Sequence, residues 1–87
     1  MSNIEEYRAI VGKIVRGRHG PYVVSYNTVL GTVTFALSPE VWQEGEHPSS
    51  GTYVVLSDIQ KKQSGWRAQK ARFLRPSDEQ PKQPAER

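Results

Sequence analysis

The 87-residue chain contains no cysteine, so neither disulfide bonds nor cysteine-ligated zinc can hold its fold together. No apolar run approaches the roughly 18–20 residues of a membrane span, and we expect no membrane partner. The first residues are acidic and lack the charged-then-apolar layout of a signal peptide, which predicts a cytoplasmic protein. A chain of this length forms one small domain, which must be stabilised mainly by apolar packing.

Residues that could support catalysis or bind a metal are scarce. His19 and His47 fall in separate expected loops, with no cysteine or third histidine to complete a metal site. The serines, such as Ser25, Ser38 and Ser57, stand in no nucleophile-elbow context. The glycines are scattered and form no phosphate-binding loop. We therefore expect no catalytic residue, no metal and no cofactor, and the chain is not expected to be an enzyme.

The net charge of +3 is unevenly distributed. Residues 38–58 hold four acidic residues and no lysine or arginine, whereas residues 59–76 hold six basic residues and no acid. A further basic group comprises Lys13, Arg16 and Arg18. If the two basic regions lie side by side, they form one positive face that attracts phosphate backbones. An ordinary solvated surface is the alternative interpretation.

Turn-forming residues recur at short intervals along the chain, which favours strands over helices. The clearest strand is the third, where Val33, Phe35 and Leu37 alternate with small or polar residues. The pattern predicts five strands, over Gly12–Arg16, Pro21–Tyr26, Leu30–Leu37, Thr52–Ile59 and Trp66–Leu74.

One short helix is predicted between the third and fourth strands. Ser38 suits an N-cap, Pro39 suits the first helical position, and Glu40 is favourable near the positive end of the helix dipole. The segment also contains Trp42, which we expect in the core or as a plug of the barrel. The layout is all-β, a five-stranded closed barrel of OB type, with an SH3-like barrel as the main rival.

The expected boundaries divide the chain into three parts. Residues 1–10 form an N-terminal segment whose apolar spacing is compatible with a short helix. Residues 11–76 form the barrel. Residues 77–87 lack aromatic and branched aliphatic side chains and are predicted to be a disordered tail.

Two stretches carry a resemblance to known families. The sequences GKIV at 12–15, GPYV at 20–23 and LGTVT at 30–34, in a strand that ends at Leu37-Ser38, resemble the RNA-binding OB module repeated in the largest small-subunit ribosomal protein. The sequences GTYVV at 51–55 and GWRA at 65–68 resemble the closing half of a cold-shock domain. Both resemblances imply an OB barrel that binds RNA or single-stranded nucleic acid.

The resemblance also suggests which residues would bind. In the ribosomal module, an aromatic residue and a histidine stack on bases; here Tyr22 keeps the first position and Thr34 occupies the second. Trp66, beside Arg67, is a second stacking candidate. Few aromatic residues remain compared with a cold-shock domain, so we expect phosphate contacts to dominate. The basic candidates are Lys13, Arg16, Arg18, Lys61, Lys62, Arg67, Lys70 and Arg72.

Two further functions stay open at this point. The thinned aromatic platform and the acidic middle also suit a barrel that binds protein, as an adaptor or regulator of a ribosome, polymerase, phage or plasmid complex. An inhibitor that acts by occlusion is the third option. If Tyr22, Trp66 and Arg72 share one face of the barrel, nucleic acid is favoured, and if the two aromatic residues point inward, a protein partner is favoured.

Overall fold

A computed structural model describes residues 6–63 and 65–76 of the chain. It contains five strands: β1 (Glu6–Gly17), β2 (Gly20–Asn27), β3 (Gly31–Ala36), β4 (Tyr53–Lys62) and β5 (Gly65–Phe73). Within this part of the chain, no helix has the length and apolar character needed to cross a membrane. The predicted tail at 77–87 lies outside the described residues.

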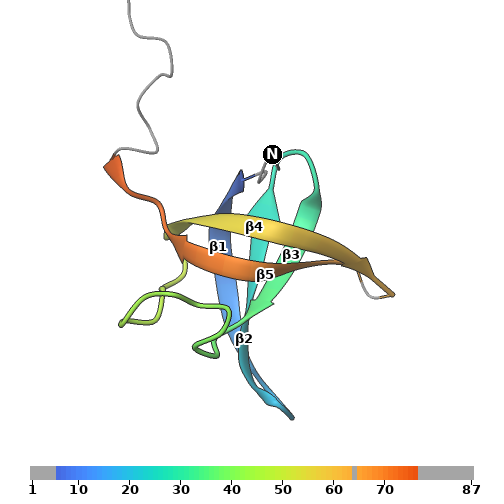
Figure 1. The fold of residues 1–87 in the computed structure, drawn as a ribbon, viewed down its shortest axis with the longest axis vertical. Helices are drawn as coiled ribbons and strands as arrows, with labels where there is room; N and C mark the ends of the chain where they lie inside the picture. Colours follow the sequence, from blue (N-terminus) through green and yellow to red (C-terminus); the bar gives the residue numbers. More distant parts are fainter. Residues whose placement is uncertain (1–5, 64, 77–87) are drawn as a thin grey trace, which may run out of the picture.

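The strands close into a barrel in the order β1-β2-β3-β5-β4 (Figure 1). Neighbouring strands are antiparallel, except that β3 and β5 pair in parallel through a short register. The β1–β2 and β4–β5 hairpins project from the barrel in different directions (Figure 1). The predicted all-β, five-stranded closed barrel is confirmed, and it is consistent with an OB-like fold.

Strand β1 is longer than predicted and takes part in two pairings. Glu6–Ile10 pairs with β4, and Ile10–Gly17 pairs with β2. The register shifts between Val11 and Lys13, so that Gly12 is the extra residue of a β-bulge. Residues 6–10 are therefore strand and not the short helix that their spacing allowed, while residues 1–5 lie outside the described part.

The predicted helix between the third and fourth strands is wrong. The amides of Val41 and Trp42 both donate to the Ser38 carbonyl, at 3.0 and 2.8 Å, and this single turn is not continued. Instead, Trp42 forms a parallel bridge with Ala71 of β5. The Gln43 amide donates to the Ala71 carbonyl at 3.0 Å. Pairing with β5 thus uses the backbone groups that a longer helix would need.

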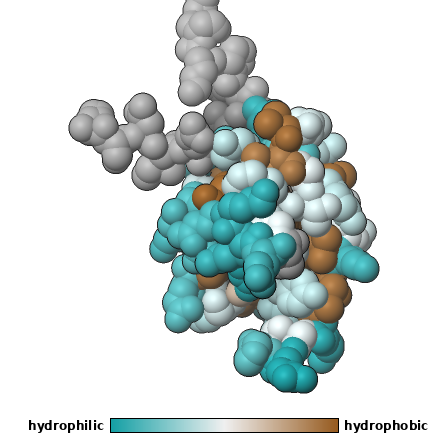
Figure 2. Space-filling view, turned by 90° about the vertical axis from the view of Figure 1, so that its right-hand side faces the viewer, coloured by the Kyte–Doolittle hydropathy of each residue, from teal (hydrophilic) through white to brown (hydrophobic). Residues whose placement is uncertain are grey.

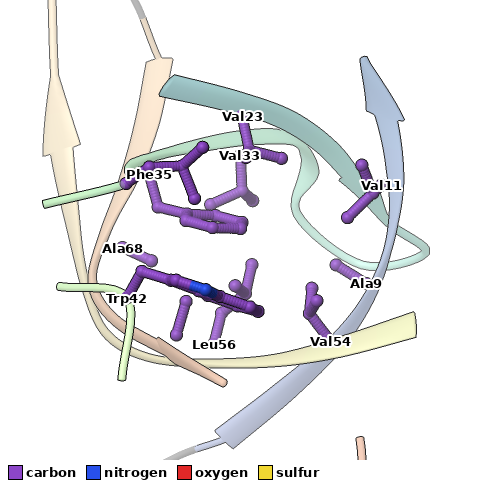
Figure 3. Close-up of a cluster of buried hydrophobic side chains, with 11 residues drawn as sticks. Ala9, Val11, Val23, Val33, Phe35, Trp42, Val54, Leu56 and Ala68 are labelled. Carbon is purple, nitrogen blue, oxygen red and sulfur yellow. The ribbon is translucent and has the colours of Figure 1, made fainter. Parts of the chain in front are cut away.

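The barrel interior is filled by side chains from all five strands and from the β3–β4 connection (Figure 3). Trp42 is buried, as predicted. Its ring is stacked on Phe35, with centroids 5.7 Å apart, and meets Phe73 edge-on at 4.9 Å. The Trp42 indole nitrogen donates to the Glu46 carbonyl at 2.7 Å. The connection therefore plugs the barrel with the Trp42 ring, whose indole N–H has a hydrogen-bond acceptor.

The inward face of β5 changes parity partway along the strand. Ala68 and Ala71 are both buried although they are three residues apart. Opposite this step, Asp58 of β4 has a left-handed backbone with a φ of 55°, and the pairing of β4 with β5 skips this position. Because Arg67 adjoins Ala68 while Lys70 and Arg72 adjoin Ala71, the step turns all three basic side chains outward.

Candidate nucleic-acid interface

Four strands bring a row of side chains together on the outside of the barrel. Lys13 is paired with Val24, Val24 with Thr34, and Thr34 with Arg67. Thr34 lies between the buried Val33 and Phe35, so its side chain points outward. We call these four residues the Lys13 row: Lys13, Val24, Thr34 and Arg67. Three of them were predicted site residues, and the register makes them neighbours.

Within the Lys13 row, polar contacts and exposure differ from residue to residue. A guanidinium nitrogen of Arg67 lies 3.5 Å from the Thr34 hydroxyl oxygen, at the long end of a hydrogen bond. Arg67 and Thr34 are half-buried, whereas Lys13 is exposed. The row thus offers the exposed ammonium group of Lys13 on β1, the half-buried guanidinium group of Arg67 on β5 and the hydroxyl of Thr34 on β3.

Tyr22 lies on the same outer face, in the next row of residues. It is paired with Val15 on one side and with Ala36 on the other. Its ring is half-buried against Gly17, where an added β-carbon would lie 3.0 Å from Tyr22 Cε2. One side of the ring therefore rests on backbone at the base of the β1–β2 hairpin, and the ring belongs to the outer face and not to the core.

The strands that form most of this face carry positive charge. Residues 7–39, which span most of β1 and all of β2 and β3, contain four basic residues and neither Asp nor Glu. Two of the four, Arg16 and Arg18, lie near the end of the β1–β2 hairpin and are exposed. Arg16 pairs with Pro21, so its side chain lies on the opposite side of the hairpin from those of Lys13 and Tyr22. Arg16 lines a cleft of about 580 Å³ between the hairpin and His47 of the β3–β4 connection, together with Ile14 and Pro21.

The β4–β5 hairpin forms a second basic region. Lys61 and Lys62 are exposed at the end of β4, and Figure 2 shows strongly hydrophilic residues gathered where this hairpin faces the viewer. Trp66 is half-buried and packs against the core. The Lys61 ammonium group lies 5.0 Å from the centroid of the Trp66 ring, as a cation–π contact. A base could stack on this side of Trp66 only if the Lys61 side chain moved.

Lys70 and Arg72 do not join the Lys13 row. An Nη2–Oε2 distance of 3.5 Å pairs Arg72 with Glu6 of β1. The Lys70 ammonium group donates to the Glu40 carbonyl at 3.5 Å. Both residues lie beyond the short β3–β5 pairing, which covers Trp66 and Arg67, and they pair with Ser57 and Val55 of β4. Arg67 pairs with both β3 and β4, so the register places only this basic residue of β5 in the Lys13 row.

A second outward row contains residues that the sequence interpretation missed. Tyr53 of β4 is paired with Ile10 of β1, and Ile10 is paired with Tyr26 of β2. Tyr26 and Tyr53 are 47% and 55% exposed. We call these three residues the tyrosine row. Strand alternation in the sequence already indicates that Tyr26 and Tyr22 lie on one face. The pairing of Tyr53 could not be predicted, because its partner Ile10 lies in the first part of β1, which was not predicted to be a strand.

The tyrosine row lines a groove of about 520 Å³. Glu6, Arg8, Asn27 and Thr28 also line this groove. The Asn27 amide donates to the Arg8 carbonyl at 2.7 Å, and its oxygen accepts from the amides of Val29 and Leu30. Asn27 thus ties the β2–β3 turn to β1 beside the groove.

The described residues contain no cluster of three or more side chains that could hold a metal ion. No protein-family model, no curated protein and no solved structure matches the chain significantly. The functional argument therefore depends on the residues of the barrel surface themselves.

Proposed function

We propose that this barrel binds single-stranded nucleic acid, RNA in particular, across the outer face of β1, β2, β3 and β5. The observation that carries the proposal is the Lys13 row, in which four strands bring two basic residues and a hydroxyl into one register. Lys13 and Arg67 would contact phosphates, Thr34 would accept or donate a hydrogen bond, and Tyr22 would stack on a base. Arg16 and Arg18 would add phosphate contacts at the end of the β1–β2 hairpin, Arg16 from the side opposite Tyr22.

The charge of these strands supports a polyanionic partner such as nucleic acid. The absence of acid from residues 7–39 means that a phosphate backbone meets no repulsion from these strands. Single strands are favoured over duplexes because an exposed ring stacks only on an unpaired base. The chemistry is binding alone: positioning of phosphates and bases, with no covalent step.

Fluorescence anisotropy with labelled decauridylate tests the proposal. We expect the folded protein to bind at low salt, more tightly than it binds an RNA duplex of equal length. The affinity should fall with salt on a logarithmic scale, because each phosphate contact releases a counterion. Decathymidylate in parallel reports the preference between RNA and DNA. A protein shown to be folded by circular dichroism that binds none of these probes would contradict the proposal.

Protein binding is a second candidate. Isolated exposed aliphatic residues support it, namely Ile14 beside the Arg16 cleft and Val29 in the β2–β3 turn. Capture of the same partner from nuclease-treated and untreated extracts, together with absence of oligonucleotide binding, would favour this candidate. Loss of every partner after nuclease treatment would contradict it.

A further inference from the structure

The tyrosine row lies next to the Lys13 row on the same barrel wall. Tyr26 is two residues beyond Val24 in β2, and both side chains point outward because Val23 and Ser25 are buried. Ile10 precedes the Gly12 bulge in β1, and Lys13 follows it. The two rows are therefore neighbouring rungs of one surface.

The ring of Tyr26 is held in place by the bulge. Gly12 has no side chain, and a β-carbon there would overlap Tyr26 Cε2 and lie 3.2 Å from the Val24 carbonyl oxygen. One side of the ring consequently rests on bare backbone, while 47% of the residue stays exposed. Tyr53 stands two strands away, which is about 10 Å between backbones, with Ile10 between the two tyrosines.

We propose that the tyrosine row is a second base-binding subsite, on which two unpaired bases of the same single strand stack against Tyr26 and Tyr53. This inference rests on the proposed function, because it extends the path of the bound nucleic acid from the Lys13 row toward β4. It adds Tyr26, Tyr53 and Ile10 to the binding residues.

Three observations favour nucleic acid over a protein segment in this groove. The groove shares Tyr26 with the outer face of β1 and β2, and Arg8 is among its lining residues. The acid in the lining, Glu6, is paired with Arg72 at 3.5 Å. The two most exposed side chains of the row are aromatic rings, which stack on any base without sequence preference.

Single substitutions in the tyrosine row test the subsite, with labelled decauridylate as the probe. We expect Tyr26→Ala and Tyr53→Ala each to weaken binding about tenfold, and Tyr26→Phe and Tyr53→Phe to bind within about twofold of wild type, since phenylalanine keeps the stacking face. Val29→Ala is the matched control, because it removes exposed apolar surface nearby without removing a ring. Urea unfolding of each variant confirms that it is folded.

The outcomes separate this inference from the proposed function. If the wild type binds and Lys13→Ala weakens binding while both alanine variants bind normally, the subsite is overturned and the proposed function stands. If the folded wild type binds no oligonucleotide, both are overturned. A dimer seen by sedimentation in the absence of nucleic acid, and dissociated by Tyr53→Ala, would overturn the subsite by showing that a second copy covers the row.

Discussion

The ring of Tyr26 lies against the backbone of Gly12, the extra residue of the bulge in β1. The contact joins two features that determine the outer surface. The bulge lets β1 pair first with β4 and then with β2, and the missing side chain leaves room for an aromatic ring on top of it. Tyr22 and Gly17 repeat the arrangement nearer the hairpin end, with Tyr22 Cε2 3.0 Å from the position of an added β-carbon.

Gly12→Ala should therefore displace the Tyr26 ring. The added methyl group overlaps the ring and crowds the Val24 carbonyl, so we expect a loss of about 1 kcal/mol in the free energy of unfolding. The ring protons of Tyr26 should shift in NMR spectra. Gly45→Ala is the control, because nothing lies within 4 Å of an added β-carbon there. Unchanged Tyr26 resonances in Gly12→Ala would contradict the contact.

Trp42→Ala should be the more damaging of the two tryptophan substitutions. Trp42 is buried between Phe35 and Phe73, so its removal leaves a cavity and should cost about 3–5 kcal/mol. Trp66→Ala should cost clearly less, because that ring is only half-buried. Urea unfolding followed by far-ultraviolet circular dichroism measures both. A larger loss for Trp66→Ala would show that the plug is not the main support of the barrel interior.

Glu44→Ala should destabilise the end of β5. The Glu44 carboxylate accepts from the Phe73 amide at 3.1 Å and lies 2.9 Å from the Arg75 guanidinium, so its loss leaves a half-buried amide without that acceptor. We expect a cost of about 1–3 kcal/mol in the free energy of unfolding. Glu46→Ala removes an equal charge from an exposed position and should have little effect. Equal losses in the two variants would mean that only net charge matters.

The features of the barrel that depend on residues close together in the sequence could be predicted. Alternation of Val33 and Phe35 with polar neighbours defines β3, and glycine punctuation separates the five strands. The buried position of Trp42 also followed from its place in the β3–β4 connection.

The errors share a cause, which is pairing between residues far apart in the sequence. Ser38, Pro39 and Glu40 satisfy helix-start preferences, but bridging of Trp42 to Ala71 ends the turn. Residues 6–10 are spaced like a helix face, but they pair with β4. Such pairings override local propensity because they bury apolar side chains and satisfy backbone groups together.

The candidate site could likewise be predicted only in part. Basic residues could be identified from the sequence, but their grouping could not, because the register decides which of them share a row. Lys13 and Arg67 share a row, whereas Lys70 and Arg72 lie beyond the β3–β5 pairing. Tyr53 joins the outer face only through its pairing with Ile10.

The comparison of Lys13→Ala with Lys70→Ala tests the central claim most directly. Both are exposed lysines in strands, and both substitutions change the net charge equally, but only Lys13 lies in the Lys13 row. In anisotropy titrations with labelled decauridylate over a series of salt concentrations, Lys13→Ala should weaken binding. It should also lower the slope of log affinity against log salt by about 0.7, while Lys70→Ala leaves both unchanged. Equal effects of the two substitutions would contradict the assignment of binding to this face.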